Sequence, residues 1–184
     1  RIVICAKLLT DILDEFLSVG KIEEGKIQVR FLNIRVDDFF QNIIQEIQGI
    51  TKEGQLVDYL HEGPPNVTLD PSLLKHIAMN LLSNAIKFSD TTIQVRTFQY
   101  ENEFKLKVSD HGIGMSREDQ QHLFERFYRG ANTSNIQGTG LGLHIVSKYC
   151  ELMNGSISCD SELDKGTTFT IILPLNDHPT NNNA

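Results

Sequence analysis

The sequence predicts an α+β domain, a two-layer α/β sandwich whose mixed, mostly antiparallel sheet is covered on one face by helices. A separate helix stub is expected to precede it. Segments of β-type alternation are interspersed with segments of helical periodicity, and some neighbouring strands are joined by hairpins while others flank a helix. With 184 residues, 40% of them apolar, the chain can bury one main core.

The first expected element is a helix over residues 2–19. Its apolar residues recur at alternating spacings of three and four, namely Ile2, Cys5, Leu9, Ile12, Phe16 and Val19. This spacing is typical of a helix that packs against another helix, and the alternative is an amphipathic helix on the core of its own domain. Gly20 and the charged residues after it are expected to end the helix.

The next stretch is expected to alternate strands and helices. Residues 26–34, 55–62 and 66–69 read as strands, and residues 36–50 read as a helix with Asp37 or Asp38 in its first turn. Asp70 is a candidate cap for a helix that begins at Pro71, because proline is tolerated at the first helical position.

The second half continues this pattern. Residues 91–101 and 103–110 form an expected hairpin, joined through Glu101 and Asn102. The stretch from His111 to Gly142 is rich in Gly and Ser, with an expected short helix at 117–127 and an expected mobile lid at 130–137. The remaining expected elements are a helix at 141–153, strands at 156–160 and 167–175, and a disordered tail at 176–184.

The bulk composition excludes several classes of protein. The net charge is −7 with scattered Lys and Arg, which argues against nucleic acid as a partner. Cys5, Cys150 and Cys159 lack metal-ligand spacing, and their odd number fits free thiols in a reducing compartment. No apolar run approaches the ~18 residues that span a bilayer. The chain starts without Met, so we expect it to be a cytoplasmic domain of a longer protein. Whether that protein has a membrane segment, which would lie upstream of Arg1, stays open.

A polar stripe marks the helix that begins at Pro71. His76, Asn80, Asn84 and Lys87 follow one another at spacings of four, four and three, so their side chains share one face. Asn is a mediocre helix former, so helix propensity alone does not explain this choice. A solvated helix face is the alternative interpretation.

Two glycine-containing segments follow. In "SDHGIGMS" a strand ends in Asp110, where an acidic group can accept a hydrogen bond from an exocyclic amine, although a plain strand-to-helix turn is the alternative. In "QGTGLGL" three glycines lead into a helix, whose free N–H groups favour phosphates, although such turns also cap helices. Between them, "LFERFYRG" offers aromatic and basic residues, and a hydrophobic loop anchor is its alternative interpretation.

The order of these segments is more specific than any one of them. The chain resembles the catalytic, ATP-binding domain of bacterial sensor histidine kinases, in the superfamily that also contains gyrase, the heat-shock chaperone ATPases and the mismatch-repair ATPases. "HIAMNLLSNAIKFS" looks like the N box of that family, "DHGIGM" like the first glycine box, "LFERFYRG" like the F box, "GTGLGL" like the second glycine box and "KGTTFTIILP" like the closing strand. The resemblance implies the Bergerat-type ATP-binding fold.

The resemblance also implies a ligand set of ATP and Mg²⁺. Asn84 would carry the Mg²⁺ that bridges the ATP phosphates, and Phe88 would stack on adenine. Asp110 would bond the adenine amino group with Thr167 nearby. Asn80, Lys87 and Arg129 are the expected catalytic residues, with Lys87 and Arg129 contacting phosphate. The backbone positions expected to make room for the base or to cradle phosphates are Gly112, Gly114, Gly138, Thr139, Gly140, Leu141 and Gly142. One amide oxygen plus phosphates is a sufficient Mg²⁺ site.

The resemblance divides the chain into three parts: 1–22 as the second helix of the dimerisation and phosphoacceptor hairpin, 26–175 as the ATP-binding catalytic domain, and 176–184 as the tail. No histidine lies in a matching acceptor motif, and His61 is expected on a surface loop because Pro64 and Pro65 forbid a helix there. Asp164 replaces a usual glycine of the closing motif.

The implied activity is transfer of the ATP γ-phosphoryl group to a histidine on a separate dimerisation domain. The implied partners are ATP or ADP, that phosphoacceptor domain, a response regulator receiver domain and, in the full-length protein, a second copy. The alternatives are a noncatalytic nucleotide-binding module, a serine-directed kinase of the superfamily and a slow ATPase. The hydrolytic relatives carry a glutamate base where this chain has Asn80, and an amide cannot take a proton.

Overall fold

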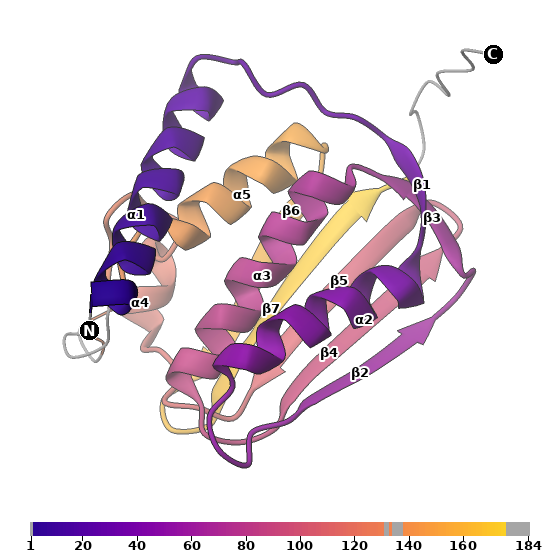
Figure 1. Cartoon of the computed structure of the whole chain (residues 1–184). Helices are drawn as coiled ribbons and strands as arrows, with labels where there is room; N and C mark the ends of the chain where they lie inside the picture. Colours follow the sequence, from indigo (N-terminus) through magenta and orange to yellow (C-terminus); the bar gives the residue numbers. More distant parts are fainter. Residues whose placement is uncertain (1, 131–132, 134–137, 176–184) are drawn as a thin grey trace.

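The computed structural model describes residues 2–130, 133 and 138–175, with only the backbone of residues 2–12. The expected tail and most of the expected lid lie outside these residues. The elements run in the order α1 (Ile2–Glu23), β1 (Leu32–Arg35), α2 (Val36–Ile47), the 3₁₀ turn η1 (Gln48–Ile50), β2 (Val57–Glu62), β3 (Asn66–Leu69), α3 (Pro71–Phe88), β4 (Ile93–Tyr100), β5 (Glu103–Asp110), α4 (Arg117–His122), α5 (Gly142–Leu152), β6 (Ser156–Glu162) and β7 (Gly166–Pro174) (Figure 1).

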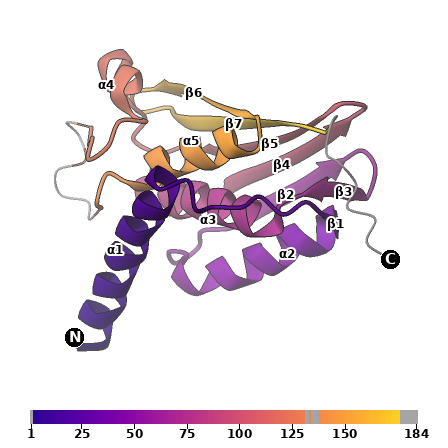
Figure 2. The same ribbon diagram turned by 90° about the horizontal axis from the view of Figure 1, so that it is seen from above.

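The main sheet has five strands in the order β2-β4-β5-β7-β6. Only β2 and β4 run parallel, and the other neighbours are antiparallel. A separate antiparallel pair joins β1 to β3. Figures 1 and 2 show α2, α3 and α5 on one face of the main sheet, with α1 beside α5 at one end of the helix layer. The predicted α+β sandwich with a mixed, mostly antiparallel sheet is confirmed.

The core lies between these helices and the sheet. The apolar face of α3 contributes Leu74, Ile77 and Leu81, which are completely buried, and β5 contributes Phe104 and Leu106, which are buried to the same extent. Burial of each such side chain stabilises the fold by about 1.5–3 kcal/mol. Because one face of α3 is fixed in the core, its opposite face has a defined direction.

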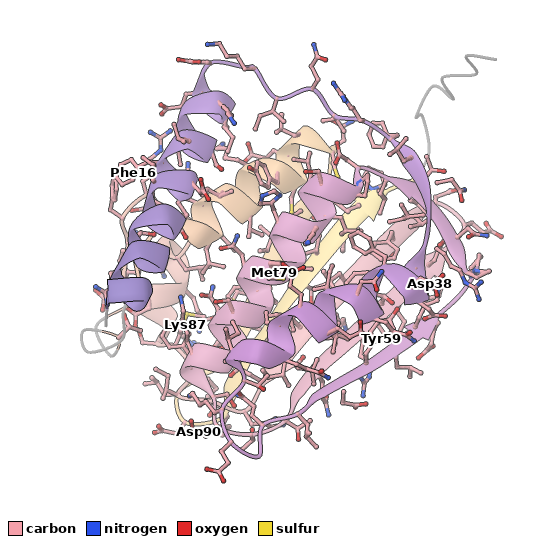
Figure 3. All side chains as sticks on the ribbon, viewed as in Figure 1. Phe16, Asp38, Tyr59, Met79, Lys87 and Asp90 are labelled. Atoms are coloured by element: carbon pink, nitrogen blue, oxygen red, sulfur yellow. The ribbon has the colours of Figure 1, made fainter. Side chains whose placement is uncertain are left out.

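Both ends of α3 are fixed by hydrogen bonds. The predicted cap is confirmed, since Asp70 Oδ1 accepts from the backbone N–H groups of Ser72 and Leu73, at 2.9 and 3.0 Å. At the other end, Lys52 Nζ donates to the Ser89 carbonyl and to Asp90 Oδ1, both at 2.7 Å. Figure 3 marks Asp90 at this end of α3. The stripe of α3 is therefore held at both ends.

Two predicted boundaries in the N-terminal part are wrong. The first helix continues through Gly20 and ends at Glu23. The turn after it is closed at Gly25, whose φ of 63° suits a helix C-terminus, with Lys26 N donating to Lys21 O at 3.0 Å. The strand expected at 26–34 forms only at Leu32–Arg35, because its partner β3 has four residues before Asp70 begins the cap of α3.

Two further expectations need correction. The short helix expected at 117–127 stops at His122, because the chain reverses before Phe127, whose φ is 60° and whose N–H bonds the Gly140 carbonyl at 3.0 Å. His61 lies in strand β2 rather than in a loop, and its ring bonds Thr97 Oγ1 at 2.9 Å across to β4. The alternation of half-buried and exposed residues in β2 therefore continues through His61 to Glu62, the last residue of the strand.

Candidate nucleotide site

The polar stripe of α3 forms one wall of a cavity of about 470 Å³. His76, Asn80, Asn84 and Lys87 all line it, so the stripe is not simply a solvated helix face. Figure 3 shows Lys87 on α3 and Phe16 on α1, a helix that also contributes residues to the lining of the cavity. The stripe and the buried face of α3 arise from the same periodicity, because residues four apart stand one above the other.

The other walls come from segments far apart in the chain. The first glycine segment supplies Asp110 and Gly114, and β7 supplies Thr167, beside Asp110 in the sheet register. The second glycine segment closes the opposite side with Gly138, Thr139, Gly140 and Gly142. Among the predicted residues, Phe88 and Arg129 also line the cavity, whereas Gly112 and Leu141 do not.

Asn80 links α3 to the start of α5. Its Nδ2 donates to the His76 carbonyl at 3.1 Å, which leaves Oδ1 directed at the second glycine segment. A Cβ on Gly142 would stand 2.6 Å from Asn80 Oδ1. A side chain at this position would therefore displace the Asn80 amide from the place it takes beside the start of α5.

Asn84 has a different environment. It is half-buried and lines the cavity, and no hydrogen bond joins its side chain to any residue that the structure describes. An amide oxygen in this setting is a hard ligand suited to Mg²⁺, which takes few protein ligands when phosphates and water complete its shell. The side chain of Leu141, in contrast, is buried in the core, and its N–H is bonded to Thr139 Oγ1 at 3.1 Å.

Asp110 is held as an acceptor at the end of β5. Its Oδ1 accepts from the N–H of Gly112 at 2.9 Å. Burial raises the pKa of the Asp110 carboxyl above its ordinary value of 3.8, while the hydrogen bonds from the backbone of Gly112 and Thr167 oppose this rise. A Cβ on Gly112 would stand 2.1 Å from the Phe88 carbonyl, so Gly112 acts by letting the loop pack on the end of α3.

The segment before the second glycine turn is anchored by a buried carboxylate. Asp119 is 7% exposed, and its two oxygens accept from Ser116 Oγ and from the Tyr128 hydroxyl, both at 2.7 Å. The hydrogen bond to Asp119 raises the pKa of Tyr128 to about 12. Next to Tyr128, Arg129 Nη2 donates to the Thr133 carbonyl at 2.8 Å. The hydrogen bond to Asp119 thus fixes the position of Tyr128 and, with it, of Arg129, the next residue in the chain.

The sequence did not point to several residues of the cavity. Asp119 and Tyr128 line it, and the Ser116-to-Asp119 spacing is a helix-capping pattern that could have been recognised. Asp14 and Glu15 line it from α1, and Thr139 Oγ1 donates a hydrogen bond to Glu15 Oε2. No local pattern indicates a contact between residues 124 positions apart.

The chain matches a known family over most of its folded part. The family model of histidine kinase-, DNA gyrase B- and HSP90-like ATPases matches residues 69–177. The sensor histidine kinase YvrG of Bacillus subtilis (strain 168) is 40% identical over 139 residues, covering 73% of this chain and 24% of the relative. The sensor histidine kinase GacS of Pseudomonas protegens (strain DSM 19095 / LMG 27888 / CFBP 6595 / CHA0) is 35% identical over 181 residues, covering 92% of this chain and 20% of the relative.

A solved structure gives the same fold. Full-length ShkA in complex with AMPPNP superposes with a TM-score of 0.82 at 20% identity, covering 93% of this chain and 37% of that chain. The chain thus spans a quarter or less of the two curated relatives and little more than a third of this structure. In the described part of the chain no helix is long and apolar enough to cross a membrane.

Proposed function

Because this chain belongs to the family of histidine kinase-, DNA gyrase B- and HSP90-like ATPases, we propose that it is the ATP-binding catalytic domain of a sensor histidine kinase. The observation that carries the proposal is the cavity in which the α3 stripe faces both glycine segments. Amides, backbone N–H groups, one Lys and one Arg suit phosphoryl transfer, which depends on positioning and charge neutralisation rather than on a protein nucleophile.

The adenine would bind at the end of the cavity formed by Phe88, Asp110 and Thr167. The Asp110 carboxylate would accept a hydrogen bond from the exocyclic amino group, and the Phe88 ring would lie against the base. Both residues line the cavity, and the loop after β5 touches the end of α3 where Gly112 packs on the Phe88 carbonyl. This backbone contact would hold the Phe88 ring and the Asp110 carboxylate at a set distance from each other.

The phosphates would lie between α3 and the start of α5. Gly138, Thr139, Gly140 and Gly142 would surround them, and the N-terminal N–H groups of the 11-residue helix α5 favour an anion there. Lys87 and Arg129 would neutralise phosphate charge. Asn84 would hold Mg²⁺, which supplies electrostatic stabilisation of charge on the phosphate oxygens when bound.

The reaction proposed for this site ends on a histidine outside it. An imidazole nitrogen of the acceptor would form a bond to the γ-phosphorus in line, the bond to the β–γ bridging oxygen would break, and ADP would leave. The imidazole proton would pass to a carboxylate beside the acceptor. A slow ATPase is the second candidate, but Asn80 is an amide held by the His76 carbonyl and cannot serve as the general base that activates water.

We propose the domain arrangement as well. Residues 1–22 would be the second helix of a dimerisation hairpin, and residues 26–175 the catalytic domain. Its further partners would be a receiver domain that takes the phosphoryl group and a second copy in the full-length protein. The support is that named relatives, which are sensor histidine kinases, extend well beyond the matched region.

Calorimetric titration of ATP with and without Mg²⁺ tests the site. Asn84→Ala should weaken Mg²⁺-dependent ATP binding by about 10- to 100-fold, the usual cost of disturbing a metal site, and leave adenosine binding unchanged. Asn33→Ala, on the exposed strand β1, is the matched control and should bind like the parent chain. Equal Mg²⁺-dependent affinity in Asn84→Ala and the parent would remove Asn84 as the metal ligand. Absence of ATP binding in all three would contradict the proposed function.

A further inference from the structure

One carboxylate from the N-terminal helix stands on the phosphate side of the cavity. Thr139 Oγ1 donates a hydrogen bond to Glu15 Oε2, and Glu15 Oε1 lies 3.9 Å from the position of a Cβ on Gly142. Glu15 therefore touches the same short segment that we propose for the phosphates. Asp14 lines the cavity beside it, so that α1 brings two acidic residues to this wall.

The packing of α1 holds this carboxylate in place. The Phe16 ring lies 6.1 Å from the Phe127 ring, and Glu23 forms an ion pair with Arg126. Val19, which lies between Phe16 and Glu23 in the sequence, is 9% exposed. The contacts with Phe127 and Arg126 reach the segment just before the second glycine segment, and Tyr128 and Arg129 in that segment line the cavity. The position of Glu15 is thus coupled to how α1 docks on the rim of the site.

The charge of Glu15 is not neutralised by a cation in the described part of the chain. No ion pair of Glu15 with Lys, Arg or His occurs there. Its stabilising partner is instead the Thr139 hydroxyl, next to the N-terminus of α5. These groups favour any anion, so a carboxylate and a phosphate group compete for them.

We propose that Glu15 is a negative determinant of nucleotide affinity. With α1 docked, the Glu15 carboxylate occupies the Thr139 hydroxyl and repels the phosphates, and ATP binds after this carboxylate has been displaced. Undocking of α1 raises the affinity for ATP. The inference rests on the proposed function, because it takes the cavity to be the ATP site.

The test compares ATP, ADP and adenosine binding to the whole chain by calorimetry at low salt. Glu15→Gln removes the charge and keeps the length of the side chain, and Glu15→Ala removes both. Either variant should bind ATP about tenfold more tightly than the parent, as expected for loss of one like charge a few ångströms from the phosphates. ADP should gain less than ATP, and adenosine, which has no phosphate, should gain nothing.

Glu24→Gln is the matched control, because it makes the same change of net charge just beyond the end of α1. Glu24 pairs with Lys26 and does not line the cavity, so this variant should bind ATP like the parent. The gain of Glu15→Gln should also shrink in high salt, since screening weakens the repulsion.

The outcomes separate the two proposals. Unchanged ATP affinity in both Glu15 variants, in a chain that binds ATP, would overturn the inference and leave the proposed function standing. An equal gain for adenosine and ATP would also overturn it, because the effect would then not involve the phosphates. Failure of the parent and of every variant to bind ATP and adenosine would overturn the proposed function, and this inference with it.

Discussion

Asp110 is the residue on which base selectivity should depend. Adenine presents an amino group where guanine presents a carbonyl, and a carboxylate accepts only from the former. Asp110→Asn should reduce the preference for ATP over GTP by about tenfold or more, because the amide can turn its donor to the guanine carbonyl. Competition binding with both nucleotides measures the preference. An unaltered preference in the variant would mean that Asp110 only supports the loop.

The same substitution should change how stability depends on pH. Since burial raises the pKa of Asp110, the folded chain holds this proton more tightly than the unfolded chain. That contribution to the free energy of unfolding is fully present below the ordinary pKa of 3.8 and is lost as pH rises through the raised pKa. Asp110→Asn should therefore gain stability relative to the parent as pH rises through this window. Urea unfolding at about pH 3.5 and about pH 7 would show it, and a constant difference would refute the pKa assignment.

Two glycines of the site differ in whether a side chain could be accommodated at their positions. Gly114 has a φ of 61°, and a Cβ there would stand 1.9 Å from the Glu162 carbonyl, whereas a Cβ on Gly138 would meet nothing within 4 Å. Gly114→Ala should lower the free energy of unfolding by about 2 kcal/mol or more, through strain and backbone displacement. Gly138→Ala, the matched control, should stay within about 0.5 kcal/mol of the parent. Urea unfolding of the two variants decides this, and equal losses would contradict the role of the Gly114 turn.

At the scale of elements, the sequence predicted α3 and the central hairpin well because their signals are local. Pro71 follows a capping Asp70, and apolar periodicity continues to the end of the helix. The end of α1 was not predicted, because Gly20 and Gly25 both resemble helix ends and only the backbone bonds at Gly25 distinguish them. The length of β1 depends on its partner β3, which no pattern within β1 itself reveals.

The cap of α3 is the element-scale feature that can be tested most simply. Asp70 is 4% exposed, caps two N–H groups of α3 and also accepts from Arg30 N at 2.7 Å. Asp70→Ala should cost about 2 kcal/mol of unfolding free energy, because three backbone N–H groups lose their acceptor and the one of Leu73 is buried. Asp70→Asn should lose less, since one side-chain oxygen remains. Chemical denaturation measures both, and an Asp70→Ala variant as stable as the parent would exclude this cap as a support of the α3 stripe.

At the scale of the whole molecule, the topology brings the proposed site together. The resemblance indicated which segments meet, and the fold places the α3 stripe, the end of β5 and the start of α5 around one cavity. Contacts between α1 and this cavity could not be predicted, because they join residues more than a hundred positions apart and depend on how α1 packs. The packing of one helix on another is set by the complete surfaces of both.

The whole chain should not phosphorylate itself. Among the described histidines, His61 alone is followed directly by an acid, Glu62, and it lies in a strand rather than on a helix. The ring of His122 bonds Glu125 at 2.8 Å, but this acid is three positions further along the chain and not the next residue. An acceptor imidazole needs an adjacent carboxylate that takes its proton during in-line attack. The catalytic groups proposed here do not include the acceptor, so a separately supplied one should be used.

The most direct measurement of the central claim is transfer of label from γ-labelled ATP to a supplied dimerisation domain that contains the acceptor helix. The chain should place acid-labile, base-stable label on that domain at high acceptor concentration and none on itself, and Asn84→Ala should lower transfer by about tenfold or more. Label on the chain alone would contradict the assignment of its histidines. No transfer at any acceptor concentration, in a chain that binds ATP, would contradict the claim that this site is a kinase site.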